Sequence, residues 1–134
     1  MSANQAFGGP VTYRGRTYPR LTMKHYGELE GALREYRRAT LQSALDQQRN
    51  LSPQDKAQQI AASEMRPVTW IDVDDWMQTH DGAVRAVRLS LRIDGKTESE
   101  ADAVLDSMTV LDAVRVARMV MGTLEIVENP PSAA

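Results

Sequence analysis

The sequence lacks cysteine and holds only two histidines, His25 and His80. Without cysteine the chain can form no disulfide, thiolate zinc site or cysteine nucleophile. Two separated histidines leave little for metal chemistry, so we predict neither a metal nor a cofactor. The sequence also lacks an HExxH motif, a serine elbow and a glycine-rich phosphate loop. We therefore expect a protein that is not an enzyme.

Two acidic patterns still invite a chemical interpretation. His25 lies near Glu28 and His80 is next to Asp81, but no third group completes an acid–base site. The run 72–75 (D-V-D-D) suggests calcium, yet Met77 stands where an EF-hand-type loop needs glycine. We expect the histidines to be solvated or capping, and the acids to stabilise a helix N-terminus.

Aromatic residues make up only 5% of the chain, whereas methionine occurs seven times. This balance suits aliphatic helix packing better than the core of a β-sandwich. The longest apolar run, around Met119–Met121, is far shorter than the ~18 residues of a membrane-spanning helix. The opening MSANQAFGGP has neither the basic nor the apolar region of a secretory signal. We expect a soluble, intracellular protein with no membrane partner.

The chain carries no excess of positive charge. Its formal net charge is −2 and its pI is about 5.7, which argues against a nucleic-acid surface over the whole domain. With 134 residues, 42% of them hydrophobic and 25% charged, the composition is that of one globular domain. We predict a flexible N-terminus over 1–10, a single domain over 11–127 and a flexible tail over 128–134.

The pattern of apolar residues predicts a mainly α, small helical domain of five to six helices with a short N-terminal β-hairpin. The hairpin covers the β-prone run from Val11 to Tyr18, with its turn at Arg14-Gly15. Capping residues and periodicity predict helices over 23–49, 53–65, 70–77, 82–93, 98–107 and 110–121. We expect the glutamine-rich region 42–63 to be the loosest part, and we see no internal repeat.

The helices predicted over 82–93 and 110–121 contain the candidate binding residues. Arg85, Arg88 and Arg92 form a stripe that either binds an acidic partner or is a solvated outer face. On the first long helix, Glu30 and Arg34 are spaced for an i,i+4 ion pair.

The helix predicted over 110–121 has an unusually wide apolar surface. Its only polar residues are Asp112, Arg115 and Arg118. Either this helix is central to the core, or its second face docks onto another chain. Methionine side chains adapt to varied partners. The residues that we predict to contact a partner are Val114, Met119, Val120 and Met121.

The last two predicted helices could also be interpreted as a DNA-binding helix-turn-helix. A recognition helix needs polar or basic side chains in its first turns to reach the base edges. That position holds Val110, Leu111 and Asp112, which opposes entry into DNA. We therefore predict no nucleic-acid partner.

The order of the motifs resembles that of a known family. The hairpin V-T-Y-R-G-R-T-Y-P leads into L-T-M-K-H-Y-G-E-L-E. Later segments are T-H-D-G-A-V-R-A-V-R-L-S-L-R and T-E-S-E-A-D-A-V-L-D-S-M-T-V-L-D-A-V-R-V-A-R-M-V-M-G. Over residues 11–122 this succession resembles the small tail assembly chaperones of long-tailed bacteriophages and their prophage relatives.

The resemblance implies a non-catalytic role. Such chaperones bind the tape measure protein, keep this long helical chain soluble and help recruit tail tube subunits. They act in the cytoplasm of the bacterial host and are absent from the mature virion. Whether the chain also associates with copies of itself is left open. The alternatives are a structural head–tail connector or completion protein of the virion and, further away, a small DNA-binding regulator.

Overall fold

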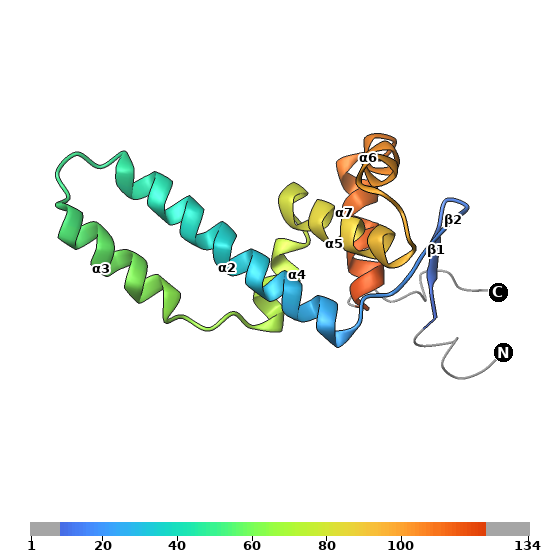
Figure 1. Ribbon diagram of the computed structural model, residues 1–134, viewed down its shortest axis with the longest axis horizontal. Helices are drawn as coiled ribbons and strands as arrows, with labels where there is room; N and C mark the ends of the chain where they lie inside the picture. The colour runs from blue at the N-terminus through green and yellow to red at the C-terminus, as the bar shows by residue number, and fades with distance from the viewer. Residues whose placement is uncertain (1–8, 123–134) are drawn as a thin grey trace.

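The computed structural model describes residues 9–122, and these form six helices and one two-stranded hairpin (Figure 1). The predicted mainly α fold with an N-terminal hairpin is therefore confirmed. The predicted tail over 128–134, the end of the predicted domain over 123–127 and most of the predicted N-terminus lie outside the described residues. The elements are β1 (Val11–Tyr13), β2 (Arg16–Tyr18), α2 (Met23–Asp46), α3 (Pro53–Glu64), α4 (Trp70–Trp76), α5 (His80–Ile93), α6 (Glu98–Asp106) and α7 (Val110–Met121).

Threonine caps begin most of the helices. The hydroxyls of Thr69, Thr79, Thr97 and Thr109 each accept a hydrogen bond from a backbone N–H in the first turn of the helix that follows. The helix predicted over 82–93 begins earlier than expected. Thr79 is the cap, and α5 begins at His80 because this hydroxyl satisfies the free N–H of Gly82.

The hairpin closes one side of the core. Its strands pair antiparallel with Val11 opposite Tyr18, and both of these side chains are buried. The predicted turn is confirmed, since Arg14 and Gly15 have φ of 50° and 80°, the conformation of a tight hairpin turn. The Tyr13 hydroxyl donates a 2.7 Å hydrogen bond to Asp112 of α7, which ties the hairpin to the last helix.

Helices α5 and α7 form the centre of the molecule and make the most extensive helix–helix contact. The chain just after β2 crosses their C-terminal halves. There the Ser90 hydroxyl donates to the Pro19 carbonyl at 2.6 Å, and the Leu21 N–H donates to the Val120 carbonyl at 2.9 Å. The buried residues of the two helices include Ala83, Ala86, Val87, Leu91, Ala113, Val116, Ala117 and Val120.

The structure reveals an internal repeat, so our expectation of none is wrong. Residues 79–88 read T-H-D-G-A-V-R-A-V-R and residues 109–118 read T-V-L-D-A-V-R-V-A-R. The order of buried, half-buried and exposed residues is the same over 81–90 and 111–120. The helices before them also correspond, with T-W-I-D-V-D over 69–74 and T-E-S-E-A-D over 97–102. The units α4–α5 and α6–α7 thus repeat one pattern of capping, sequence and burial, and we call each of them a two-helix unit.

The two copies are linked by equivalent ion pairs that cross between them. Asp74 of α4 lies 3.6 Å from Arg118 of α7, and Asp102 of α6 lies 2.7 Å from Arg88 of α5. Each acid comes from the first helix of its two-helix unit, and each arginine comes from the second helix of the other unit. The repeat is hard to see in the sequence because α4 and α6 differ in length and few residues are identical.

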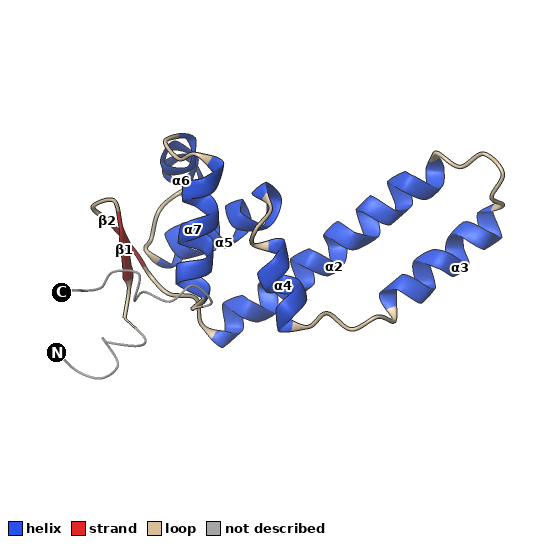
Figure 2. Ribbon diagram, turned by 180° about the vertical axis from the view of Figure 1, so that it is seen from behind, coloured by secondary structure: helices blue, strands red, loops and turns tan. Residues whose placement is uncertain are grey.

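Beyond this helical core, α2 and α3 form an antiparallel arm that projects to one side (Figures 1 and 2). The first turns of α2 pack on the core through the buried Leu29 and Leu33. Helix α3 packs against the second half of α2 and buries no residue fully. At the far end of the arm Leu45 is buried and helps to hold the two helices together.

Candidate functional site

The predicted arginine stripe lies on α5, but most of its charge is paired within the chain. Arg88 forms ion pairs with Glu98 and Asp102 of α6, and Arg92 lies 3.4 Å from Glu28 of α2. In residues 9–122 no carboxylate lies within ion-pairing distance of the exposed Arg85. The stripe therefore fastens α5 to its neighbours, and Arg85 is its one member available to a partner.

The predicted partner-binding residues of α7 do not form one surface. Met119 and Val120 are only 3% and 1% exposed, so the prediction that they contact another chain is wrong for this protomer. They belong to the core because α7 is covered on one side by α5 and on another by the chain after β2. Val114 and Met121 are half-buried and pack at the edge of the core. The central-helix alternative thus explains most of the apolar surface of α7.

The apolar side chains that α7 does expose are at its start. Val110 and Leu111, in its first turn, are 56% and 59% exposed. Val110 lies at the rim of a cavity of about 230 Å³ between α5, α6 and α7. The apolar residues that line this cavity are Val84, Leu105, Met108, Val110 and Ala113. We call Val110, Leu111 and this cavity the α7 entry surface.

The internal repeat shows that the fold does not require these apolar residues. The positions in α5 that correspond to Val110 and Leu111 hold His80 and Asp81, which are also exposed. Both helix starts are closed by the same threonine cap. Since one copy tolerates polar residues there, the valine and leucine of the other copy are not explained by packing within the protomer.

A second apolar pair stands at the start of α4. Trp70 and Ile71 are 61% and 54% exposed. The corresponding positions in α6 hold Glu98 and Ser99. Trp70 is left outside because it follows the cap directly, and Val73 and Trp76 turn toward the core instead. Sequence analysis missed both pairs. The signal that could have found them is an apolar residue directly after a threonine cap.

Two of the acidic residues named from the sequence, Asp72 and Asp112, act in helix caps, whereas Asp74 pairs with Arg118. The Thr69 N–H donates to Asp72 at 3.0 Å, and this bond is the main reason why the pKa of Asp72 lies below its usual range. The Tyr13 hydroxyl and then the Thr109 N–H lower the pKa of Asp112 in the same way. In the part of the chain that the structure describes, no group of three or more potential metal ligands gathers.

Both histidines lie in the first turn of a helix, His25 in α2 and His80 in α5. His25 Nδ1 is 2.7 Å from the Thr22 hydroxyl at the start of α2, as expected for a capping residue. His80 is exposed and lies 3.8 Å from the carboxylate of Asp81.

Comparisons with known proteins do not assign a family. No protein-family model matches the chain, and neither the curated proteins nor the solved structures contain a match. Among the described helices, none combines the length and the apolar character needed to cross a lipid bilayer. The α7 entry surface is therefore the candidate functional site on geometry alone.

Proposed function

We propose that the protein is an assembly chaperone that binds an exposed helical client, of the kind that keeps the phage tape measure protein soluble. The observation that carries the proposal is the pair Val110 and Leu111, which stands exposed where the repeat places His80 and Asp81. The resemblance of residues 11–122 to tail assembly chaperones supports this choice of client. The proposal also includes action in the host cytoplasm, absence from the mature virion and assistance to tail tube subunits.

The α7 entry surface suits a reversible apolar contact. A helical client that exposes a row of apolar side chains could place one of them in the cavity between Leu105 and Met108 while Leu111 covers the next. The burial is modest, so that the contact can be released when the client assembles. Many weak contacts along a long client would hold it in solution by mass action.

The test exchanges the apolar pair for the residues that the repeat already accepts. In the variant Val110→His/Leu111→Asp we expect an unchanged melting temperature and about thirtyfold weaker binding of the tape measure protein. That loss corresponds to roughly 2 kcal/mol of binding free energy, because two apolar side chains are no longer buried in the complex. Co-expression would show the same change as a smaller soluble fraction of the tape measure protein.

The matched control changes the position of the other copy that corresponds to Leu111. Asp81→Ala alters the first turn of α5 without touching the cavity, which His80 helps to line, and should leave client solubility as in the unchanged protein. Equal solubility of the client with Val110→His/Leu111→Asp would contradict the proposed surface. Failure of the unchanged protein to solubilise the tape measure protein would contradict the function itself.

Mass spectrometry of purified particles separates this function from that of a structural connector. A chaperone should be absent from the finished particle, whereas a connector or completion protein is present in fixed copy number. Detection of the chain in mature particles would therefore reject the chaperone role.

A further inference from the structure

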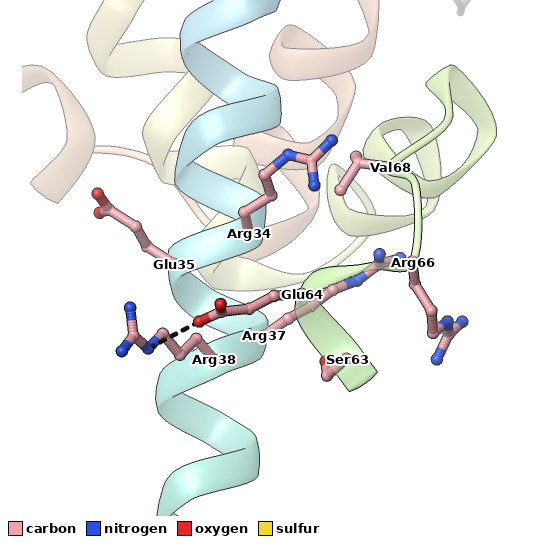
Figure 3. Close-up of a pocket in the computed structure, with 8 residues that line it drawn as sticks. All are labelled: Arg34, Glu35, Arg37, Arg38, Ser63, Glu64, Arg66 and Val68. Carbon is pink, nitrogen blue, oxygen red and sulfur yellow. Dashed lines mark ion pairs between the residues drawn. The ribbon is translucent and has the colours of Figure 1, made fainter. Parts of the chain in front are cut away.

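The α2–α3 arm contains a pocket with a concentration of positive charge, which we call the arm pocket (Figure 3). Its volume is about 290 Å³. Three of its residues, Arg34, Arg37 and Arg38, lie on one face of α2 because they are spaced by three and four. A fourth arginine, Arg66, comes from the segment after α3, and Val68 forms an apolar part of the wall.

Two of the four guanidinium groups are not matched by acids of the chain. Arg38 lies 3.2 Å from Glu64, and Arg37 lies 3.2 Å from Asp72. Among the described residues, Arg34 and Arg66 have no carboxylate within ion-pairing distance. The ion pair between Glu30 and Arg34 that the sequence predicts is not formed. In Figure 3 the Arg34 side chain extends toward Val68, across the mouth of the pocket.

The arm pocket continues into an apolar groove between the two helices. This groove has a volume of about 660 Å³ and shares Arg37, Ser63 and Arg66 with the arm pocket. The side chains that make it apolar are Tyr36, Leu41, Ala44 and Ala62. Tyr36 is 39% exposed, although its ring packs at a tilt against that of Trp76 with a ring-centre distance of 5.5 Å. Apolar surface and unmatched positive charge thus lie side by side.

We propose that the arm binds an acidic amphipathic helix of a partner protein. The apolar face of that helix would lie in the groove, and its carboxylates would pair with Arg34 and Arg66. Guanidinium groups match carboxylates well because two parallel N–H groups can bind both oxygens. This inference rests on the arm alone and does not depend on the client proposed for the α7 entry surface.

The same features favour an acidic protein segment over a nucleic acid. The wall of the arm pocket includes Glu35 and Glu64, and the whole chain has a net charge of −2. A continuous phosphate backbone would meet these carboxylates, whereas a helix can place its acids only where the arginines lie. The apolar groove likewise suits leucine-type side chains rather than a sugar–phosphate chain.

The inference can be tested by fluorescence anisotropy on the full chain. The probe is a labelled synthetic amphipathic helix with leucines on one face and glutamates on the other. A second probe carries glutamine in place of every glutamate. We expect saturable binding of the glutamate peptide that weakens as salt is added, and at least about tenfold weaker binding of the glutamine peptide.

Variants assign the binding to the arm pocket. Arg34→Gln/Arg66→Gln should weaken binding of the glutamate peptide by about tenfold or more, because two charge-assisted contacts are lost. The control Arg16→Gln/Arg115→Gln removes the same charge from two exposed arginines outside the arm and should change binding by less than about twofold. Circular dichroism of both variants should match that of the unchanged protein, since all four side chains are exposed.

Three results would overturn the inference. The first is no saturable binding of the glutamate peptide up to about 1 mM, which is the weak limit of useful recognition. The second is equal loss of binding in the arm-pocket variant and in the control. The third is tighter binding of a single-stranded DNA of similar length than of the glutamate peptide, which would identify the arm as a nucleic-acid surface.

Discussion

The guanidinium of Arg88 lies 2.7 Å from the carboxylate of Asp102, and the same relation recurs between Arg118 and Asp74. In both cases the acid is in the short first helix of one two-helix unit and the arginine is in the second helix of the other. Two copies of one unit therefore hold each other across the core. This arrangement fixes α5 and α7 side by side and leaves the starts of α4 and α7 at the surface.

The two equivalent ion pairs should differ in their contribution to stability. The Asp74 side chain is 18% exposed and solvent does not reach the Nε of Arg118, whereas the Asp102 side chain is 58% exposed. Arg88 also keeps Glu98 as a second acid. We expect Asp74→Ala to lower the free energy of unfolding by about 1–3 kcal/mol and Asp102→Ala by about 0.2–1 kcal/mol. Urea unfolding of both variants gives the comparison, and the reverse order would contradict it.

Gly82 should be the glycine that the fold tolerates least. A Cβ at this position would overlap the carbonyl group of Trp76, which is held in place by the Thr79 hydroxyl at 2.6 Å. We expect Gly82→Ala to destabilise the protein by about 2 kcal/mol or more, because neither backbone can move freely.

Gly31 provides the control for this substitution. It lies in α2 with open space around its Cα, so Gly31→Ala should stabilise the protein by about 0.5–1 kcal/mol through helix propensity. Thermal unfolding followed by circular dichroism measures both variants. A Gly82→Ala protein as stable as the unchanged one would show that α4 and α5 do not approach as closely as described.

Most of the fold could be predicted from local signals in the sequence. Helix α7 was predicted from Val110 to Met121, and the structure has the same bounds, because Thr109 and Gly122 mark its two ends. Gly15 at the hairpin turn was equally clear. These features depend on a few neighbouring residues, and a sequence displays such residues directly.

The candidate site could not be predicted, because it depends on which helices pack together. The apolar surface of α7 was visible in the sequence, but its neighbours α5 and the chain after β2 decide that Val120 is buried. Likewise Arg34 and Arg66 are far apart in sequence and line the same pocket only because α3 folds back on α2. The surface at Val110 becomes informative once the repeat provides His80 for comparison.

Stability should fall on acidification partly through Asp112. The hydrogen bond from the Tyr13 hydroxyl at 2.7 Å is the largest cause that lowers the pKa of Asp112 in the folded state. A folded-state pKa below the unfolded value means that the unfolded chain binds the proton more readily. The contribution is therefore present above about pH 4 and is lost as the pH falls through the folded-state pKa.

Two variants isolate this contribution. Asp112→Asn and Tyr13→Phe should each lower the melting temperature near neutral pH and flatten its dependence on pH below about pH 5. The melting temperatures of the variants and the unchanged protein should then draw closer in acid. Parallel pH profiles would show that Asp112 does not couple folding to protonation. Asp72 and Glu100, whose pKa values are also lowered by backbone hydrogen bonds, should keep part of the pH dependence in both variants.

An aspartate should lower the stability of the protein strongly at the end of α7 and hardly at all at its start. Val120 is 1% exposed, so Val120→Asp places a carboxylate in the core and should cost about 3–5 kcal/mol of stability, a large share of what a domain of this size has. Leu111 is 59% exposed, and Leu111→Asp should change the free energy of unfolding by less than about 0.5 kcal/mol. Loss of client binding in the Val120 variant would therefore report unfolding, whereas the same loss in the folded Leu111 variant would report a lost contact. Chemical unfolding and a binding titration on the same two proteins distinguish these outcomes. A Val120→Asp protein as stable as the unchanged one would contradict the burial of Val120 and make that end of α7 a candidate binding surface again.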